Sequence, residues 1–211
     1  MPADATSDPT QQIDALLDFW FGQDWENAPA AEVAQRQKKL WWSKNPEIDA
    51  ECRTRFEPML QEAAANRLAD WADAARSTLA LILLLDQIPR NIYRGTPQAF
   101  AFDEQARQHT HLALAMGIDQ ELPPIARVFI YMPLEHSEDI DDQQYVVQLF
   151  RALAKQAAPE EKKDFDGFAD YARKHHAVIE AFGRFPHRNK ILGRPSTAEE
   201  TAFMTQPGSS F

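Results

Sequence analysis

The chain has 211 residues, and its 32 acidic and 22 basic side chains give it a net charge of −10 at pH 7. This balance argues against nucleic acid or an anionic membrane surface as the main partner. The single cysteine, Cys52, excludes an intramolecular disulfide, and no stretch reaches the roughly 18 apolar residues of a membrane span. The acidic start lacks the apolar core of a signal peptide. We therefore expect a cytoplasmic protein of bacterial type that binds neither nucleic acid nor membrane.

Helical periodicity recurs along the whole chain. In the first segment, Ile13, Leu16, Leu17, Trp20 and Phe21 follow the spacing of one helix face. No segment alternates apolar and polar residues over the length of a strand. The pattern predicts a single all-α domain, 1–211, of about nine or ten helices, with loose tails at 1–8 and 206–211. The expected helices lie near 9–21, 31–42, 46–66, Trp71, 78–89, 97–116, 124–132, 138–157, 159–182 and after Thr197.

One segment is expected to lie at the centre of the fold. Leu79 to Leu85 are seven consecutive apolar residues, a run that is typical of a helix buried on nearly all sides. Polar residues follow abruptly, and Pro89 is expected to end or bend the helix. Polar groups at the end of so buried a helix cost desolvation unless they are paired or bind something.

Three polar clusters stand out. We call them the first cluster, the acidic cluster and the basic loop, and the basic loop has no acidic residue although the chain as a whole is acidic. The first cluster and the basic loop also resemble each other, since each places Pro, Arg and Asn close together with another Arg following. The first cluster is Asp86, Gln87, Arg90, Asn91 and Arg94; the acidic cluster is Glu135, His136, Ser137, Glu138, Asp139, Asp141 and Asp142; the basic loop runs from Gly183 to Arg194.

These clusters suggest a site for a small anion. Arginine presents a planar fork that matches a carboxylate or a phosphate, and asparagine can fix the orientation of a ligand. If the clusters converge, they would form a pocket for a small anionic molecule. An equally good interpretation is structural, in which the arginines pair with the acidic cluster or cap helix ends. The candidate ligand-binding residues are Arg90, Asn91, Arg94, Arg184, Arg188, Asn189 and Arg194.

The same clusters contain groups that could transfer protons. If the protein is an enzyme, His136 and His187, with Glu135 or Glu138, are the candidates for acid–base catalysis. No HExxH motif or paired Cys/His spacing is present, so we assign no metal ligands and the sequence indicates no particular cofactor. The remaining histidines on helical stripes, including His175, are interpreted as half-buried packing residues.

The motifs around these clusters resemble those of a known family. Leu84–Pro97, Met132–Asp139 and Gly183–Asn189, with Asp18–Phe21 and Trp41-Trp42, are similar to the bacterial family known as domain of unknown function 924. The resemblance covers nearly the whole chain. It implies a tetratricopeptide-like superhelical array of packed antiparallel helices, and it implies no activity or cofactor.

Three functions follow from these observations as hypotheses. The first is a protein that binds a small carboxylate or phosphate ligand in a pocket of Arg, Asn and His. The second is an interaction scaffold that grips a peptide in its groove. The third is a metal-assisted hydrolase. Whether the three clusters meet in space separates the first hypothesis from the structural interpretation.

Overall fold

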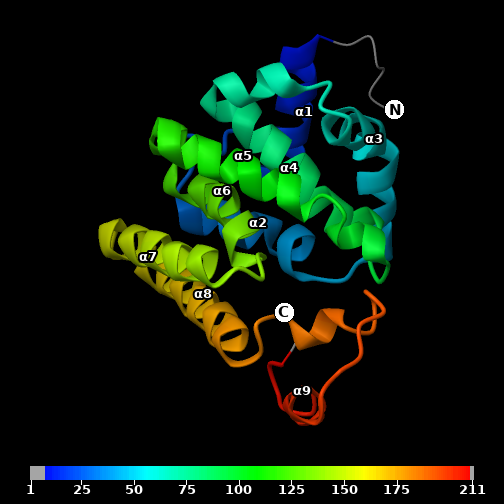
Figure 1. The fold of residues 1–211 in the computed structure, drawn as a ribbon. Helices are drawn as coiled ribbons and strands as arrows, with labels where there is room; N and C mark the ends of the chain where they lie inside the picture. The colour runs from blue at the N-terminus through cyan, green and yellow to red at the C-terminus, as the bar shows by residue number, and fades with distance from the viewer. Residues whose placement is uncertain (1–7, 210–211) are drawn as a thin grey trace.

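The computed structural model describes residues 8–209, and this part of the chain is all-helical, with nine α-helices, four short 3-10 helices and no strand (Figure 1). The predicted fold class is therefore confirmed, while the tetratricopeptide-like array stays a prediction. The elements are α1 (Pro9–Phe21), α2 (Ala30–Trp42), α3 (Pro46–Ala64), η1 (Ala69–Asp73), α4 (Ala75–Ile92), η2 (Pro97–Phe100), α5 (Asp103–Met116), η3 (Ile118–Glu121), α6 (Pro124–Glu135), α7 (Ile140–Gln156), α8 (Lys162–Phe182), η4 (Pro186–Arg188) and α9 (Ala198–Phe203).

Helix α4 is the centre of the fold. It contacts α1, α3, α5 and α6, and the run from Leu79 to Leu85 is almost completely buried. A continuous apolar core surrounds it, to which α1, α2 and α6 add the aromatic rings of Trp20, Phe21, Trp41 and Phe129. Burial of so much apolar surface is the main favourable contribution to folding, and it holds the end of α4 in a fixed place.

Two prolines do not stop their helices where the sequence suggested. Helix α4 continues through Pro89 to Ile92, and α6 continues through Pro133 to Glu135. Tertiary bonds explain the extra turn of α6. The buried side chain of Gln143 donates to the carbonyl oxygens of Leu134 and Glu135 in the last turn of the helix, where carbonyl groups lack α-helical partners. Helix α6 therefore runs past residue 132, where the sequence pattern predicted its end, and of the two outcomes predicted for Pro89 the end of the helix is wrong.

Gln143 also fixes the segment that follows α6. Its Nε2 atom lies 2.7 Å from the carbonyl oxygen of Ser137, and the side chain is fully buried. Asp139, whose carboxylate accepts from the backbone N–H of Asp141, begins the next helix. Residues 136–139 of the acidic cluster therefore form a short turn between α6 and α7, and the side chain of Gln143 holds this turn.

The C-terminal segment folds back onto the helices after α8 (Figure 1). Gly183 ends α8 in the left-handed conformation, with φ of 65°, which favours glycine. Phe185 then packs with Val178 and Ile179 of α8 in a small second core. Thr197 and Glu200 form a capping box at the start of α9.

The described residues include parts of both expected tails. Asp8 caps α1 by accepting from the backbone N–H of Thr10. At the other end, residues 206–209 form a turn in which Ser209 is buried and donates to the carbonyl oxygen of Met204. The tail residues 1–7 and 210–211 lie outside the described residues. Between residues 8 and 209, no helix combines the length and the apolar character needed to cross a membrane.

Candidate functional site

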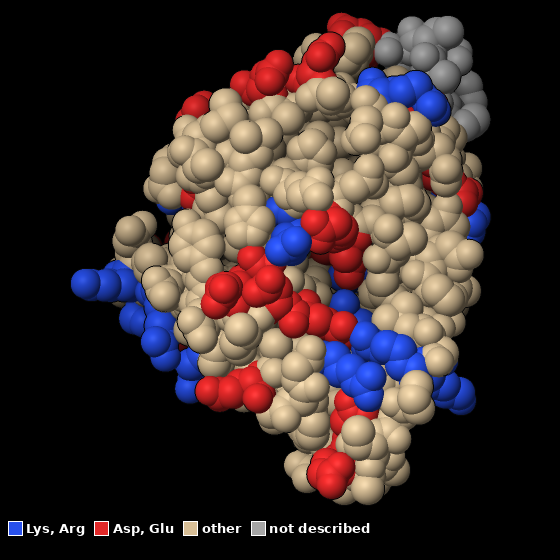
Figure 2. All heavy atoms as spheres, in the orientation of Figure 1, with Lys and Arg blue, Asp and Glu red and all other residues tan. Residues whose placement is uncertain are grey.

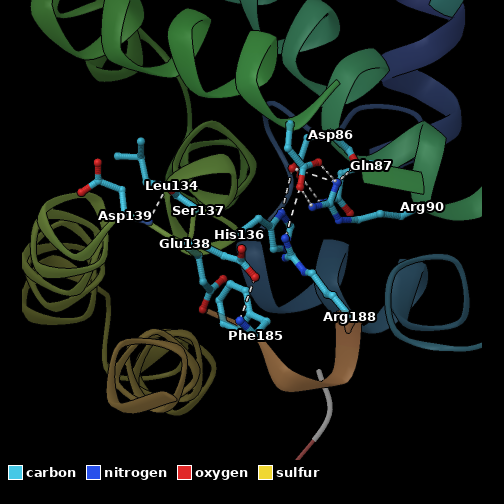
Figure 3. A network of polar contacts seen from close by, with 12 residues as sticks. Asp86, Gln87, Arg90, Leu134, His136, Ser137, Glu138, Asp139, Phe185 and Arg188 are labelled. Carbon is cyan, nitrogen blue, oxygen red and sulfur yellow. Dashed lines mark hydrogen bonds and ion pairs between the residues drawn. The ribbon is translucent and has the colours of Figure 1, made fainter. Parts of the chain in front are cut away.

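The three polar clusters come together at the end of α4. His136 of the acidic cluster bonds to Asp86 of the first cluster, and Glu138 accepts from the backbone N–H of Phe185 in the basic loop at 2.8 Å. Figure 3 shows Arg188 extending from the basic loop toward Asp86 and His136. We call this region the polar centre and define it by the residues Asp86, Arg90, Asp103, Glu135, His136, His175 and Arg188.

Asp86 is the hub of the polar centre. It is 0% exposed, and its Oδ1 atom lies 2.7 Å from Nδ1 of His136 and 3.2 Å from Nη1 of Arg90. Gln87 donates to its other oxygen at 2.6 Å (Figure 3). Burial alone would raise the pKa of Asp86, but Arg90 and His136 outweigh burial and hold the pKa below its usual value. Asp86 is therefore an ionised carboxylate inside the core.

Both terminal nitrogens of Arg90 bind protein groups. It donates to both oxygens of Asp103, at 2.8 and 3.0 Å, and to the backbone carbonyl oxygen of Asp86 at 2.6 Å. The two bonds to Asp103 form the bidentate pair that suits a guanidinium. Arg90 therefore has little capacity left for a ligand, and it acts as the link between α4 and α5.

Glu135 and His175 form a second buried pair beside the first. The Oε1 atom of Glu135 lies 3.3 Å from Nδ1 of His175, which donates to the carbonyl oxygen of Tyr171 at 2.9 Å. Burial, reinforced by Asp86, raises the pKa of Glu135 to about 8. Burial lowers the pKa of His175 to about 3. Both side chains are therefore held in their neutral forms near pH 7.

Arg188 differs from the other arginines of the site. Its side chain is only 8% exposed and its guanidinium lies over the rings of Phe185 and Phe100, at 4.5 and 4.7 Å from their centroids. Its sole hydrogen bond among the residues that the structure describes is a long one, 3.4 Å from Nη1 to Asp103. The buried Nε atom has no hydrogen bond within residues 8–209. Burial, followed by repulsion from Arg90, lowers the pKa of Arg188 to about 10.

The other two arginines of the loop are bound to carboxylates. Arg194 donates to both oxygens of Glu138, at 2.6 and 2.9 Å. Arg184 donates to both oxygens of Glu200, at 2.6 and 2.9 Å, and Asn189 also donates to Glu200. Burial would raise the pKa of Glu138, but the bonds from Arg194 and the loop backbone lower it. These pairs fix the shape of the basic loop.

Two predicted site residues lie apart from the polar centre. Arg94 donates to both oxygens of Asp49 on α3, each at 2.8 Å, and Asn91 donates to the same carboxylate at 3.0 Å. They tie the end of α4 to α3. His187, by contrast, belongs to the loop beside Arg188, and burial together with Arg188 lowers its pKa to about 4.

Sequence reasoning missed three contributors to this site. Asp103 resembled an ordinary acid in the first turn of a helix, and His175 resembled a packing residue on a helical stripe. Phe100 carried no signal at all. Each acquires its role only when α5, α8 and η2 are packed around the end of α4. The one available hint was Asp86 itself, an acid directly after seven apolar residues.

The arrangement of potential metal ligands is also informative. Within residues 8–209, no group of three or more His, Cys, Asp or Glu side chains is placed to hold a metal ion. Neighbouring acidic and histidine side chains are instead engaged by arginine and backbone groups, as Glu138 and Asp86 are. The geometry therefore lends no support to the hydrolase hypothesis.

Comparison with known proteins places the chain in a family. The model of the family described as "Bacterial protein of unknown function (DUF924)" matches residues 16–208. The chain belongs to this family. The matched range contains all three polar clusters, so the polar centre lies within the part that the family model covers.

A solved structure supports the same assignment. The chain is similar to the protein of unknown function ATU0120 from Agrobacterium tumefaciens, with 34% sequence identity and a TM-score of 0.78. The match covers 93% of this chain and 98% of that one. A search of curated proteins gives no match. The relationship of this DUF924 protein to its relatives thus establishes family and fold, and the function has to be argued from the site.

Proposed function

We propose that this protein binds a small anionic molecule, a carboxylate or a phosphate, at Arg188. The observation that carries the proposal is the state of the Arg188 guanidinium, which is buried and retains unused donors. A buried donor without a partner costs roughly 1–3 kcal/mol, and more when the group is charged. An anion that accepts from Nε and a terminal nitrogen of Arg188 would remove this cost in bidentate fashion.

The rest of the polar centre supports this choice of residue. Arg90, Arg184 and Arg194 each bind a protein carboxylate through two hydrogen bonds, whereas Arg188 has one long contact. The guanidinium lies over the rings of Phe100 and Phe185, so the N–H groups along its edge are the polar surface that remains for a ligand. Because only 8% of the Arg188 side chain reaches solvent, the contact fits one small group, such as a single carboxylate or phosphoryl group.

Thermal unfolding with and without anions tests the proposal. Phosphate, sulfate or malonate should raise the melting temperature of the parent above that in sodium chloride of equal ionic strength, because ligand at 100 times Kd stabilises by about 2.7 kcal/mol. The Arg188→Met variant should lose this response. Its own melting temperature should stay within a few degrees of the parent, because Asp103 keeps both bonds to Arg90 and a costly buried charge is removed.

A matched variant controls for the loss of an arginine as such. Arg94→Met removes a guanidinium that binds Asp49 on α3, so the response to anions should persist even if stability falls. The proposal fails if none of the three anions shifts the parent, or if Arg188→Met responds as strongly as the parent.

The scaffold hypothesis keeps one specific observation in its favour. An open groove of about 650 Å³ between α7 and α8 has four basic side chains and two acidic ones in its lining: Arg151, Lys155, Lys162, Arg173, Asp166 and Asp170. Figure 2 shows Lys and Arg side chains gathered along this edge of an otherwise acidic protein. An acidic peptide fits such a groove by charge. We rank the scaffold hypothesis second because Lys162 and Arg173 already form ion pairs with acids on α8. Salt also screens charge interactions at exposed sites of this kind.

A further inference from the structure

His136 has a second ring nitrogen that Asp86 does not use. Its Nδ1 atom bonds to Asp86 at 2.7 Å, while Nε2 makes no hydrogen bond to any described residue, and the side chain keeps 12% of its surface exposed. Two chains of contacts connect the imidazole to the Arg188 guanidinium. One runs through Asp86, Arg90 and Asp103, and the other runs through the rings of His175 and Phe185.

The partner of Nδ1 decides the state of Nε2. An ionised carboxylate such as Asp86 can only accept, so Nδ1 of His136 carries a proton. In the neutral imidazole Nε2 is then an acceptor with an exposed lone pair. An anion placed against that lone pair is repelled, whereas an anion placed against a protonated Nε2 receives a charge-assisted hydrogen bond.

We propose that His136 is the second recognition group of the anion site and that its Nε2 atom takes up a proton from solvent as the anion binds. The inference rests on the proposed function. In effect, the site binds one anion together with one proton. The site would thus favour small carboxylates and phosphate monoesters on the acidic side of neutrality. The only covalent bond that forms in this step is the N–H bond at Nε2, and the buffer acid supplies the proton.

The charges around His136 support this coupling. Asp86 and Arg90 from α4 and Asp103 from α5 act directly on His136, which in turn acts on His175 from α8 and His187 from the basic loop. Glu135, its neighbour in the chain, pairs with His175, and Arg188 acts on both of those histidines. The carboxylates of Asp86 and Asp103 balance the two guanidiniums, and Glu135 is neutral. One bound anion leaves an excess negative charge in a buried site, and one proton restores the balance.

The proton goes to His136 rather than to its neighbours for an electrostatic reason. Burial lowers the pKa of His175 to about 3 and that of His187 to about 4. Burial and Arg90 also lower the pKa of His136, but Asp86, bonded directly to its ring, acts in the opposite direction. An added anion would act in the same direction as Asp86 and raise the pKa of His136.

Isothermal titration calorimetry with sulfate tests the inference, because sulfate does not titrate near pH 7. Titrations in PIPES and in Tris, which differ in ionisation enthalpy, should show uptake of up to about one proton per sulfate bound by the parent. His136→Asn keeps an N–H that can donate to Asp86 but lacks Nε2. It should bind sulfate without proton uptake and about tenfold more weakly, the effect of losing one charge-assisted hydrogen bond.

A second His–Asp pair provides the control. His111 lies 2.7 Å from Asp142 through Nε2 but is 45% exposed, so His111→Asn should leave affinity and proton uptake unchanged. Sulfate binding by the parent without proton uptake, or uptake that persists in His136→Asn, would overturn the inference and leave the proposed function standing. Failure of the parent to bind sulfate, with no response to phosphate or malonate either, would overturn both.

The inference also has a test that needs no variant. The Cε1–H resonances of the six histidines can be followed against pH in the parent, with and without sulfate. The pKa of one histidine should rise by about one unit or more in sulfate, and its absence from the spectrum of His136→Asn or another His136 variant would assign it. Unchanged titration of all six histidines in saturating sulfate would contradict the inference.

Discussion

Replacing Asp86 with asparagine should destabilise the protein by about 3–5 kcal/mol, since it removes one partner of a buried ion pair. Asp86 is 0% exposed and receives bonds from His136 and Gln87 in addition to the contact with Arg90. The amide carries no charge to balance Arg90, and it can accept through one oxygen only. Urea denaturation at pH 7 measures the loss directly.

The same experiment has an internal control and a pH dependence. Asp166→Asn makes the same chemical change in the ion pair with Lys162, where the Asp166 side chain is 53% exposed. It should therefore lower the free energy of unfolding by less than about 1 kcal/mol. The pKa of Asp86 is lower in the folded protein than in the unfolded chain. Its contribution is therefore present above about pH 4 and lost as the pH falls below that value. A deficit of less than about 1 kcal/mol at pH 7 would show that the Asp86 charge is dispensable.

Glu135→Gln should stabilise the protein at pH 8 by about 2–4 kcal/mol relative to the parent. The buried carboxyl of Glu135 has a folded-state pKa of about 8, well above the value in an unfolded chain. Between roughly pH 4.5 and 8 the unfolded chain releases this proton while the folded protein keeps it, so the parent loses stability as the pH rises. Glutamine mimics the neutral acid and does not titrate.

Denaturation at pH 5 and at pH 8 separates this effect from any change in packing. The advantage of Glu135→Gln should be small at pH 5 and largest at pH 8, because the penalty of the parent accumulates over that window. His175 has the opposite tendency, since its depressed pKa favours folding above about pH 6.5, and it contributes equally to both proteins. An equal difference at the two pH values would mean that Glu135 is not buried as a neutral acid.

Local signals predicted the helices well because they depend on short-range chemistry. The apolar stripe of α1 and the glycine that ends α8 gave their boundaries directly. The predicted end of α6 before Pro133 was wrong because a distant side chain compensates for the local disruption. Gln143, which lies on the next helix, caps α6 beyond its proline. No rule that considers only neighbouring residues can include such a partner.

The candidate site was predictable in part. The similarity between the first cluster and the basic loop has a physical meaning, because Arg90 and Arg188 both contact the carboxylate of Asp103. The asparagines next to them diverge, since Asn91 bonds to Asp49 and Asn189 to Glu200. The residue types in the sequence show that an arginine can bind an anion. They do not show which arginine already has a protein carboxylate, and that distinction depends on tertiary packing.

The Nε–H resonance of Arg188 reports most directly on the central claim, that this guanidinium has a donor available for an anion. It can be assigned in a ¹H–¹⁵N spectrum by its absence from Arg188→Met. Addition of sulfate should shift the Arg188 resonance downfield and slow its exchange with water, while the signal of Arg94, bound to Asp49, stays in place. An Arg188 resonance that does not move at sulfate concentrations up to those that stabilise the parent would contradict the claim.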